Sequence, residues 1–145
     1  MQIRRMLVGA LALLALAPGA LLAQARVDTD AALRSEKAEL LSEQGWLLAN
    51  QDRNFEMAAS YTLEAALLRD NSPAKVHDLL NAGRYHFYSH QPLKAVSALT
   101  AAGEVALALG DIAAARKAFL DGAWVAAEAG DVHTARELLV RTAPA

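Results

Sequence analysis

Two similar stretches near the C-terminus decide the fold: ALGDIAAARKAF at residues 108–119 and EAGDVHTARELL at residues 128–139. In each, a Gly-Asp pair is followed by Ala-Arg, which starts five residues after the glycine. Glycine readily adopts the left-handed conformation that ends a helix, and aspartate caps the start of the next helix. The repeated pair therefore predicts two tight turns between helices, at glycines 20 residues apart.

The same spacing extends one step further toward the N-terminus, because His90 stands 20 residues before Gly110. Each turn is followed after five residues by a small residue and after nine by a large apolar one: Ala95 and Leu99, Ala115 and Phe119, Ala135 and Leu139. Short turns force neighbouring helices to run antiparallel. A small residue lets the next helix approach closely, and the large residue fills the remaining space, so we expect stacked helical hairpins.

The rest of the chain after residue 25 also predicts helix almost throughout. It is rich in Ala, Leu, Glu and Arg, and no stretch alternates apolar and polar residues as a half-buried strand would. Polar turns and prolines divide it into helices that end near residues 50, 69, 89, 109, 129 and 141, and the first begins near residue 29. The expected fold class is all-α, with about six antiparallel helices in three stacked hairpins.

Between Leu99 and Ala127 the order of residue types resembles the tetratricopeptide repeat. A large residue precedes a small pair, a Gly-Asp turn, a small alanine and an aromatic: Leu99, Ala102-Gly103, Ala106, Leu109-Gly110-Asp111-Ile112, Ala115, Phe119 and Gly122. The resemblance implies a tetratricopeptide-like α-solenoid, in which the first helix of each hairpin lines a concave groove for a partner peptide. It also implies a non-catalytic protein–protein interaction module, an adaptor or scaffold.

A second phasing of the same helices is equally compatible with the sequence. Gly45, Gly83 and Gly122 each stand in the middle of an expected helix, 38 and 39 residues apart, and each precedes a turn. This phasing pairs the first helix with the second, the third with the fourth, and the fifth with the sixth. A plain alanine-rich helical bundle uses the same short turns and is the alternative architecture.

The first 25 residues are typical of a secretory signal peptide. Arg4 and Arg5 precede the apolar run MLVGALALLALA at residues 6–17, Pro18-Gly19 interrupt it, and Ala23-Gln24-Ala25 has the small-x-small pattern of a cleavage site. The run is shorter than the approximately 20 residues that span a bilayer. We expect residues 1–25 to be the signal peptide and residues 26–145 a single domain, located in the bacterial periplasm or secreted, with no membrane span after cleavage.

Composition narrows the classes of function. The formal net charge is −2 with acids and bases well mixed, whereas nucleic-acid binding favours a concentrated basic patch, so no nucleic-acid partner is expected. The chain has no cysteine, which excludes disulfides, thiolate nucleophiles and thiolate metal sites. We find no glycine-rich phosphate loop, nucleophile elbow or HExxH motif, and we therefore expect no enzyme and no cofactor.

Large aromatic residues appear on otherwise polar helix faces. The face of the third helix opposite its apolar stripe carries His77, Asn81, Arg84 and Tyr88, and comparable faces of the first and fifth helices carry Trp46 and Trp124. Tryptophan, tyrosine and arginine dominate interface hot spots because each combines contact area with a polar group. With the resemblance above, the expected groove residues are Trp46, His77, Arg84, Tyr88 and Trp124. The alternative is that these aromatics pack against an adjacent helix, as most aromatics in small helical domains do. The expected partner is a protein or peptide, and exposed end repeats also permit a homo-oligomer.

A metal or small-molecule carrier built as a helical bundle in the cell envelope is the alternative function. His86 and His90 are four residues apart, a spacing that brings two imidazoles to one side of a helix. His77 stands nine residues before His86. No acidic residue or third histidine accompanies the pair at ligand spacing, so no metal site is predicted.

Overall fold

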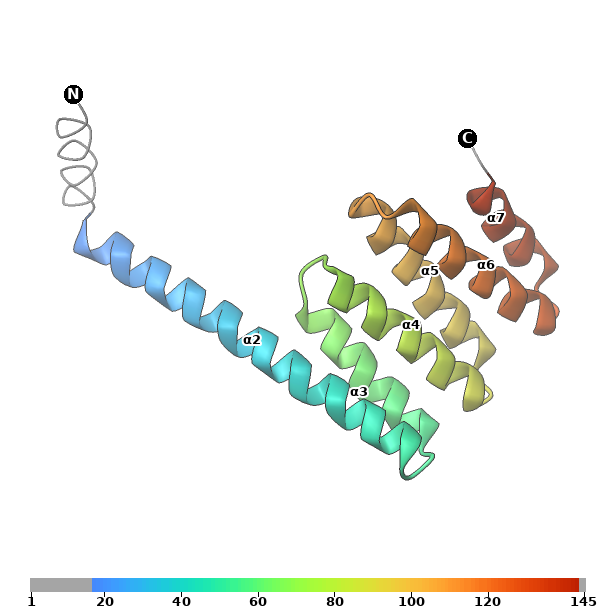
Figure 1. Ribbon diagram of the computed structural model, residues 1–145, viewed down its shortest axis with the longest axis horizontal. Coiled ribbons are helices and arrows are strands. Elements are labelled where there is room, and N and C mark those ends of the chain that lie inside the picture. Colours follow the sequence, from blue (N-terminus) through green and yellow to red (C-terminus); the bar gives the residue numbers. More distant parts are fainter. Residues whose placement is uncertain (1–16, 144–145) are drawn as a thin grey trace. The chain divides into compact units, whose positions relative to one another are not determined.

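The computed structural model describes residues 17–143, and within this range every regular element is a helix. The helices are α2 (Pro18–Asn50), α3 (Phe55–Leu68), α4 (Pro73–Tyr88), α5 (Pro92–Ala108), α6 (Ile112–Glu128) and α7 (Val132–Thr142). From α3 to α7 each helix packs against the next one along the chain, and Figure 1 shows them stacked side by side. The predictions of an all-α class and of a stack of helical hairpins are confirmed.

The chain divides into two compact units, residues 1–34 and 35–145. In the first unit the described residues from Pro18 onward are helical and exposed. The predicted start of the first helix near residue 29 is therefore wrong. Proline suits the first position of a helix, because its fixed φ is helical and the N–H that it lacks would have no partner there. Pro18 begins α2, and Gly19 continues it.

The predicted signal peptide is covered only in part by the described residues. Its charged start and nearly all of its apolar run, residues 1–16, lie outside them, and the expected cleavage site Ala23-Gln24-Ala25 lies within α2. Export therefore stays a prediction. Among the described residues, no helix combines the length and the apolar character that crossing a membrane requires.

The three turns predicted by the 20-residue spacing share one backbone geometry. The φ angles of His90, Gly110 and Gly130 are 61°, 78° and 82°, so all three residues are left-handed. In each case the next N–H donates to a carbonyl five residues earlier: Gln91 to His86 at 2.8 Å, Asp111 to Ala106 at 2.9 Å and Asp131 to Ala126 at 2.9 Å. This is the Schellman ending of a helix. The aspartate side chains then cap the next helices, accepting from the N–H groups of Ala114 and Thr134.

Glycines inside the helices set how closely neighbouring helices approach. A methyl group added to Gly83 would lie 2.8 Å from Cγ of Leu99, and one added to Gly122 would lie 3.2 Å from Cδ1 of Leu138. Gly103 faces the ring of Phe119 in the same way, and Gly45 faces the hydroxyl of Thr62. Each such glycine thus receives a side chain 16 or 17 residues further on. Contacts of this kind, between a glycine and a side chain of the next helix, join α2 to α3, α4 to α5 and α6 to α7. They also join α5 to α6.

One predicted core position is wrong. Leu99 and Phe119 are buried as expected, but the large residue buried on α7 is Leu138, while Leu139 is about half exposed. The receiving glycine of α6 is Gly122, so the side chain that enters the space it leaves stands one position earlier than the 20-residue spacing indicates. The remaining core is largely alanine, which lets the helices pack closely around few large side chains.

Candidate functional site

The three large aromatic residues predicted for the groove lie at the surface of α2, α4 and α6. Trp46, Tyr88 and Trp124 are 54%, 54% and 55% exposed. Monomeric proteins bury most of their large aromatic area, since removing it from water is strongly favourable. None of the three rings is fully buried, but Tyr88 packs against Phe55 of α3 and Trp124 against Phe87 of α4, as the alternative of packing against an adjacent helix expects. Three exposed rings at corresponding places on alternate helices form one face of the stack, which we call the first-helix face.

A groove between α4 and α6 brings three of the five predicted residues together. Arg84 and Tyr88 of α4 and Trp124 of α6 line it, with Asp121 beside Trp124. The groove has a volume of about 300 Å³, and Gly83, Leu99 and Val125 also line it. An arginine and an aspartate on opposite helices give this apolar hollow polar groups of both signs.

A row of contacting aromatic rings extends from α3 to α6. The ring of Phe55 lies 5.1 Å from that of Tyr88, Tyr88 lies 5.9 Å from Phe87, and Phe87 lies 5.4 Å from Trp124, all measured between centroids. Such distances suit attractive edge-to-face and tilted aromatic pairs. These contacts restrict the rings of Tyr88 and Trp124, although about half of each side chain stays exposed.

A second hollow continues this groove toward the ends of α4 and α6. It has a volume of about 380 Å³ and shares Phe87, Tyr88 and Val125 with the first. His90, Pro92 and Glu128 line its remaining sides, together with Ala129. The apolar channel beside Trp124 is therefore longer than one side chain.

A separate groove lies between α2 and α4 and contains the other two predicted residues. Trp46 of α2 and His77 of α4 line it, with a volume of about 460 Å³. Nε2 of His77 lies 3.1 Å from the amide nitrogen of Asn81, which fixes the ring against its own helix. Glu39 and Glu43 place acidic groups along the α2 side of this groove.

Beneath this groove lies a buried ion cluster that sequence reasoning missed. Asp78 is 1% exposed, and its carboxylate accepts from Ser42 Oγ at 2.7 Å and from Arg69 Nε at 2.6 Å. Arg69 also donates to Glu39 at 2.8 Å. Burial alone would lower the pKa of Arg69, but the hydrogen bonds to Asp78 and Glu39 outweigh it and raise the pKa, so the guanidinium stays charged. The cluster ties α2, α3 and α4 together.

The sequence offered little signal for this cluster or for one further groove residue. Asp78 stands next to a predicted core position on α4, and a single charge in a helical pattern normally indicates a solvated face. The further groove residue is Phe87, which is partly buried and lines the α4/α6 groove. Its position between Tyr88 and Trp124 depends on which helices become neighbours.

The histidines do not gather at one place. His77 lines the α2/α4 groove, whereas His86 is buried and lines a different groove between α3 and α5. His90 holds the left-handed turn before α5 and is exposed. Between residues 17 and 143, no three His, Asp or Glu residues come close enough together to hold a metal ion.

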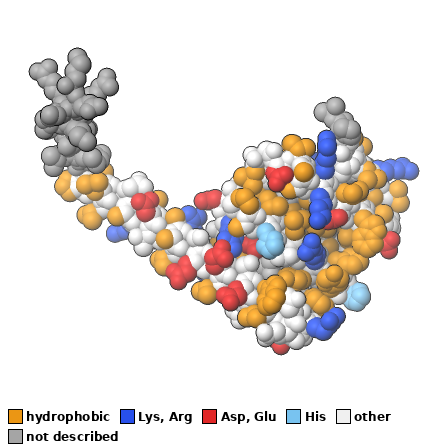
Figure 2. Space-filling view, viewed as in Figure 1, with side chains coloured by type: hydrophobic (Ala, Val, Ile, Leu, Met, Phe, Trp, Pro, Cys, Tyr) orange, Lys and Arg blue, Asp and Glu red, His pale blue; other side chains and the backbone are white. Residues whose placement is uncertain are grey.

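Charges on the visible surface of the stack are mixed. Figure 2 shows hydrophobic side chains reaching the surface across the stack, with basic and acidic side chains scattered between them. On the surface visible in Figure 2, basic groups do not form the continuous patch that binding to a phosphate backbone favours.

No protein-family model, curated protein or solved structure matches this chain.

Proposed function

We propose that this protein is a non-catalytic interaction module that binds a protein or peptide partner on its first-helix face. The single observation that carries the proposal is the exposure of Trp46, Tyr88 and Trp124 on alternate helices of one stack. Exposed tryptophan and tyrosine rings beside apolar grooves are the usual anchors of protein interfaces. The module would act by binding alone, as an adaptor or scaffold, without a chemical step.

The two grooves suit side chains of different kinds. The α4/α6 groove combines the faces of Tyr88 and Trp124 with Leu99 and Val125, and it would take an apolar or aromatic side chain of the partner. The α2/α4 groove combines Trp46 with Glu43, and it would favour a basic side chain, whereas Glu39 in the same lining already pairs with Arg69. A partner segment that crosses α2, α4 and α6 would therefore carry a basic residue at one end and an apolar residue at the other.

The proposed architecture is that of a tetratricopeptide-like solenoid, in which the first helices of successive hairpins form the binding face. The left-handed turns, the small residues after them and the glycines that receive large side chains support this likeness. We further propose that the N-terminal segment directs export to the periplasm or the exterior, on the strength of its charged, apolar and small-x-small order.

Site-specific photocrosslinking in cells tests the proposed binding face. A photoreactive residue would replace Trp124 in one variant and Leu93 in the control. Leu93 is 70% exposed on α5, and it lines neither groove of the first-helix face. Because a partner in the groove touches the ring position directly, we expect a discrete crosslinked species at position 124 that is absent at position 93.

A second variant separates binding from folding. Arg84→Ala in the chain with the photoreactive residue at position 124 removes a groove side chain that is exposed and forms no ion pair within residues 17–143. We expect weaker crosslinking with unchanged helicity. Equal crosslinking at positions 124 and 93, or a crosslink unaffected by Arg84→Ala, would contradict the proposed groove. A crosslink only to a second copy of the chain would identify the partner as the protein itself.

A further inference from the structure

A groove on the opposite set of helices has the character of a small-molecule site. It lies between α3 and α5, with α4 forming its floor, and its volume is about 510 Å³. Ligand sites for small molecules typically measure about 300–1,000 Å³. Residues of α3 and α5 form the two walls of this groove, so it is separate from the first-helix face, and the inference drawn from it does not rest on the proposed function.

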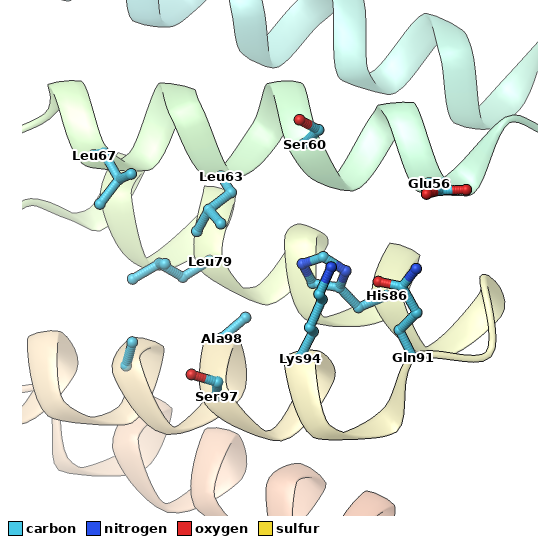
Figure 3. A pocket seen from close by; sticks show the side chains of 11 residues that line it. Glu56, Ser60, Leu63, Leu67, Leu79, His86, Gln91, Lys94, Ser97 and Ala98 are labelled. Carbon is cyan, nitrogen blue, oxygen red and sulfur yellow. The ribbon is translucent and has the colours of Figure 1, made fainter.

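The two ends of this groove differ in chemistry (Figure 3). Leu63, Leu67 and Leu79 gather at one end, and His86, Gln91 and Lys94 lie toward the other. An apolar half and a hydrogen-bonding half in one groove match a ligand with an aliphatic body and a polar head. Leu67 is 72% exposed although it lines the groove, so apolar surface is available there.

The imidazole of His86 has an unmet hydrogen-bonding group. The residue is 8% exposed, and its Nδ1 atom is buried without a hydrogen-bond partner among the described residues. A buried polar atom without a partner costs about 1–3 kcal/mol, and such atoms in native proteins are few and call for an explanation. Because Nδ1 is closed to solvent, a bound polar group would become its partner once the ring turned toward the groove.

The charges around the ring favour an anionic group. Lys94 is exposed at the polar end, and it forms no ion pair within residues 17–143. Burial lowers the pKa of His86, and the positive charge of Lys94 lowers it further. An anion placed between them would interact favourably with the ammonium and would stabilise the protonated imidazole. Glu56 is the one acid in the lining of this groove, and it opposes an anion.

We propose that the α3/α5 groove binds an aliphatic monocarboxylate. The carboxylate accepts hydrogen bonds from Lys94 Nζ and the His86 ring, and the hydrocarbon chain lies along Leu63, Leu67 and Leu79. A single carboxylate would pair with the ammonium and, with the ring turned toward the groove, supply the partner that Nδ1 lacks. The leucine end of the groove is apolar, although Ser60 and Ser97 also line the groove, so an unbranched chain along the leucines gains from being removed from water.

Titration with decanoate, followed by NMR of the histidine side chains and by calorimetry, tests the proposal. Concentrations stay below the onset of micelle formation. Decanol and decyltrimethylammonium are the matched probes, because they keep the chain and change only the head. We expect saturable binding of decanoate, with shifts of the His86 ring resonances and a raised His86 pKa, and binding at least about tenfold weaker for both other probes.

Exposed positions supply variants that should fold normally. Lys94→Met keeps the aliphatic stem and removes the charge, and we expect decanoate to bind about tenfold more weakly. Glu56→Gln removes the opposing charge and should tighten binding. Decanol binding as tightly as decanoate, equal affinity of the Lys94→Met variant, or decanoate binding without a change at His86 would each overturn the proposal.

Discussion

The two ends of the stack use the same spacing of helices but hold it with different chemistry. At the C-terminal end, Gly103 receives the ring of Phe119 and Gly122 receives Leu138, so apolar side chains fill the space left by each glycine. At the N-terminal end Gly45 receives Thr62, whose buried hydroxyl has no hydrogen-bond partner among the described residues. There the ion cluster around Asp78 ties the helices together in addition to the apolar cluster around Tyr85.

The comparison shows that the close approach of two helices and the stabilisation of their contact have different causes. Glycine permits two helices to come near each other in both halves, but only in the second does a large apolar side chain fill the space beside the glycine. A buried ion pair stabilises a fold weakly overall, yet removing one partner is costly because the other charge stays buried and unpaired. The N-terminal end should therefore be more sensitive to loss of a single polar group than the C-terminal end.

The largest expected effect is from Asp78→Ala. It leaves the Arg69 guanidinium without its closest anion in a largely buried position, and we expect the free energy of unfolding to fall by about 3–5 kcal/mol. Urea unfolding measures this change. Glu39→Gln, which alters the exposed partner of the same arginine, is the control and should cost at most about 1 kcal/mol. Similar losses in both variants would show that Asp78 has no special part in the cluster.

Gly83→Ala tests whether the glycine sets how closely α4 and α5 approach. The added methyl group would lie 2.8 Å from Leu99 Cγ, so the two helices must shift, and we expect a loss of about 1–3 kcal/mol in urea unfolding. Ser60→Ala is the control, because it places the same alanine at an exposed position of α3 inside the stack. It should leave the stability of the stack unchanged. A stabilising effect of Gly83→Ala, as expected from helix propensity alone, would contradict the spacing role.

A smaller effect is expected at the turn that lacks glycine. His90 adopts the left-handed conformation that Gly110 and Gly130 adopt at the two following turns, and this costs a residue with a side chain about 1 kcal/mol. We expect His90→Gly to stabilise the stack by about that amount in thermal or urea unfolding. Gly110→His should have the reverse effect. Destabilisation by His90→Gly would mean that the imidazole contributes contacts that outweigh backbone strain.

The smallest expected effect is a dependence of stability on pH. The pKa of His86 is lowered by burial and by Lys94 of the packed helix α5, while Glu56 lines the same groove from α3. Because the unfolded state binds the proton more readily, stability should fall as pH drops through about 6.5. His86→Phe should flatten melting temperatures between about pH 5 and 8. An unchanged slope in that variant would assign the dependence to other groups.

Much of the fold could be predicted because the turns carry their own signals. The Gly-Asp pairs fix where α5, α6 and α7 end or begin, and their predicted boundaries agree with the structure within a few residues. The burial of Leu138 could not be predicted, because it depends on which residue of α6 is the receiving glycine. The burial of Asp78 could not be predicted from the sequence either, because its partners Ser42 and Arg69 come from α2 and from the end of α3.

The candidate site was predictable in its residues but not in its grouping. A large aromatic on a polar helix face identified Trp46, Tyr88 and Trp124. Their division between two grooves depends on the order in which α2, α4 and α6 become neighbours. The α3/α5 groove had no signal, because His86 and Lys94 lie on different helices and their separation in sequence indicates no common site.

The most direct test of the central claim compares stability and partner binding in the Trp46→Ala and Trp124→Ala variants. If the rings form a binding face, each variant should lose at most about 1–1.5 kcal/mol of unfolding free energy, mainly at the contact of Trp124 with Phe87. Capture of the partner crosslinked at position 88, where a photoreactive residue replaces Tyr88, should be lost in the same variants. A loss of about 3–5 kcal/mol, as for buried aromatics, or undiminished capture would contradict the account.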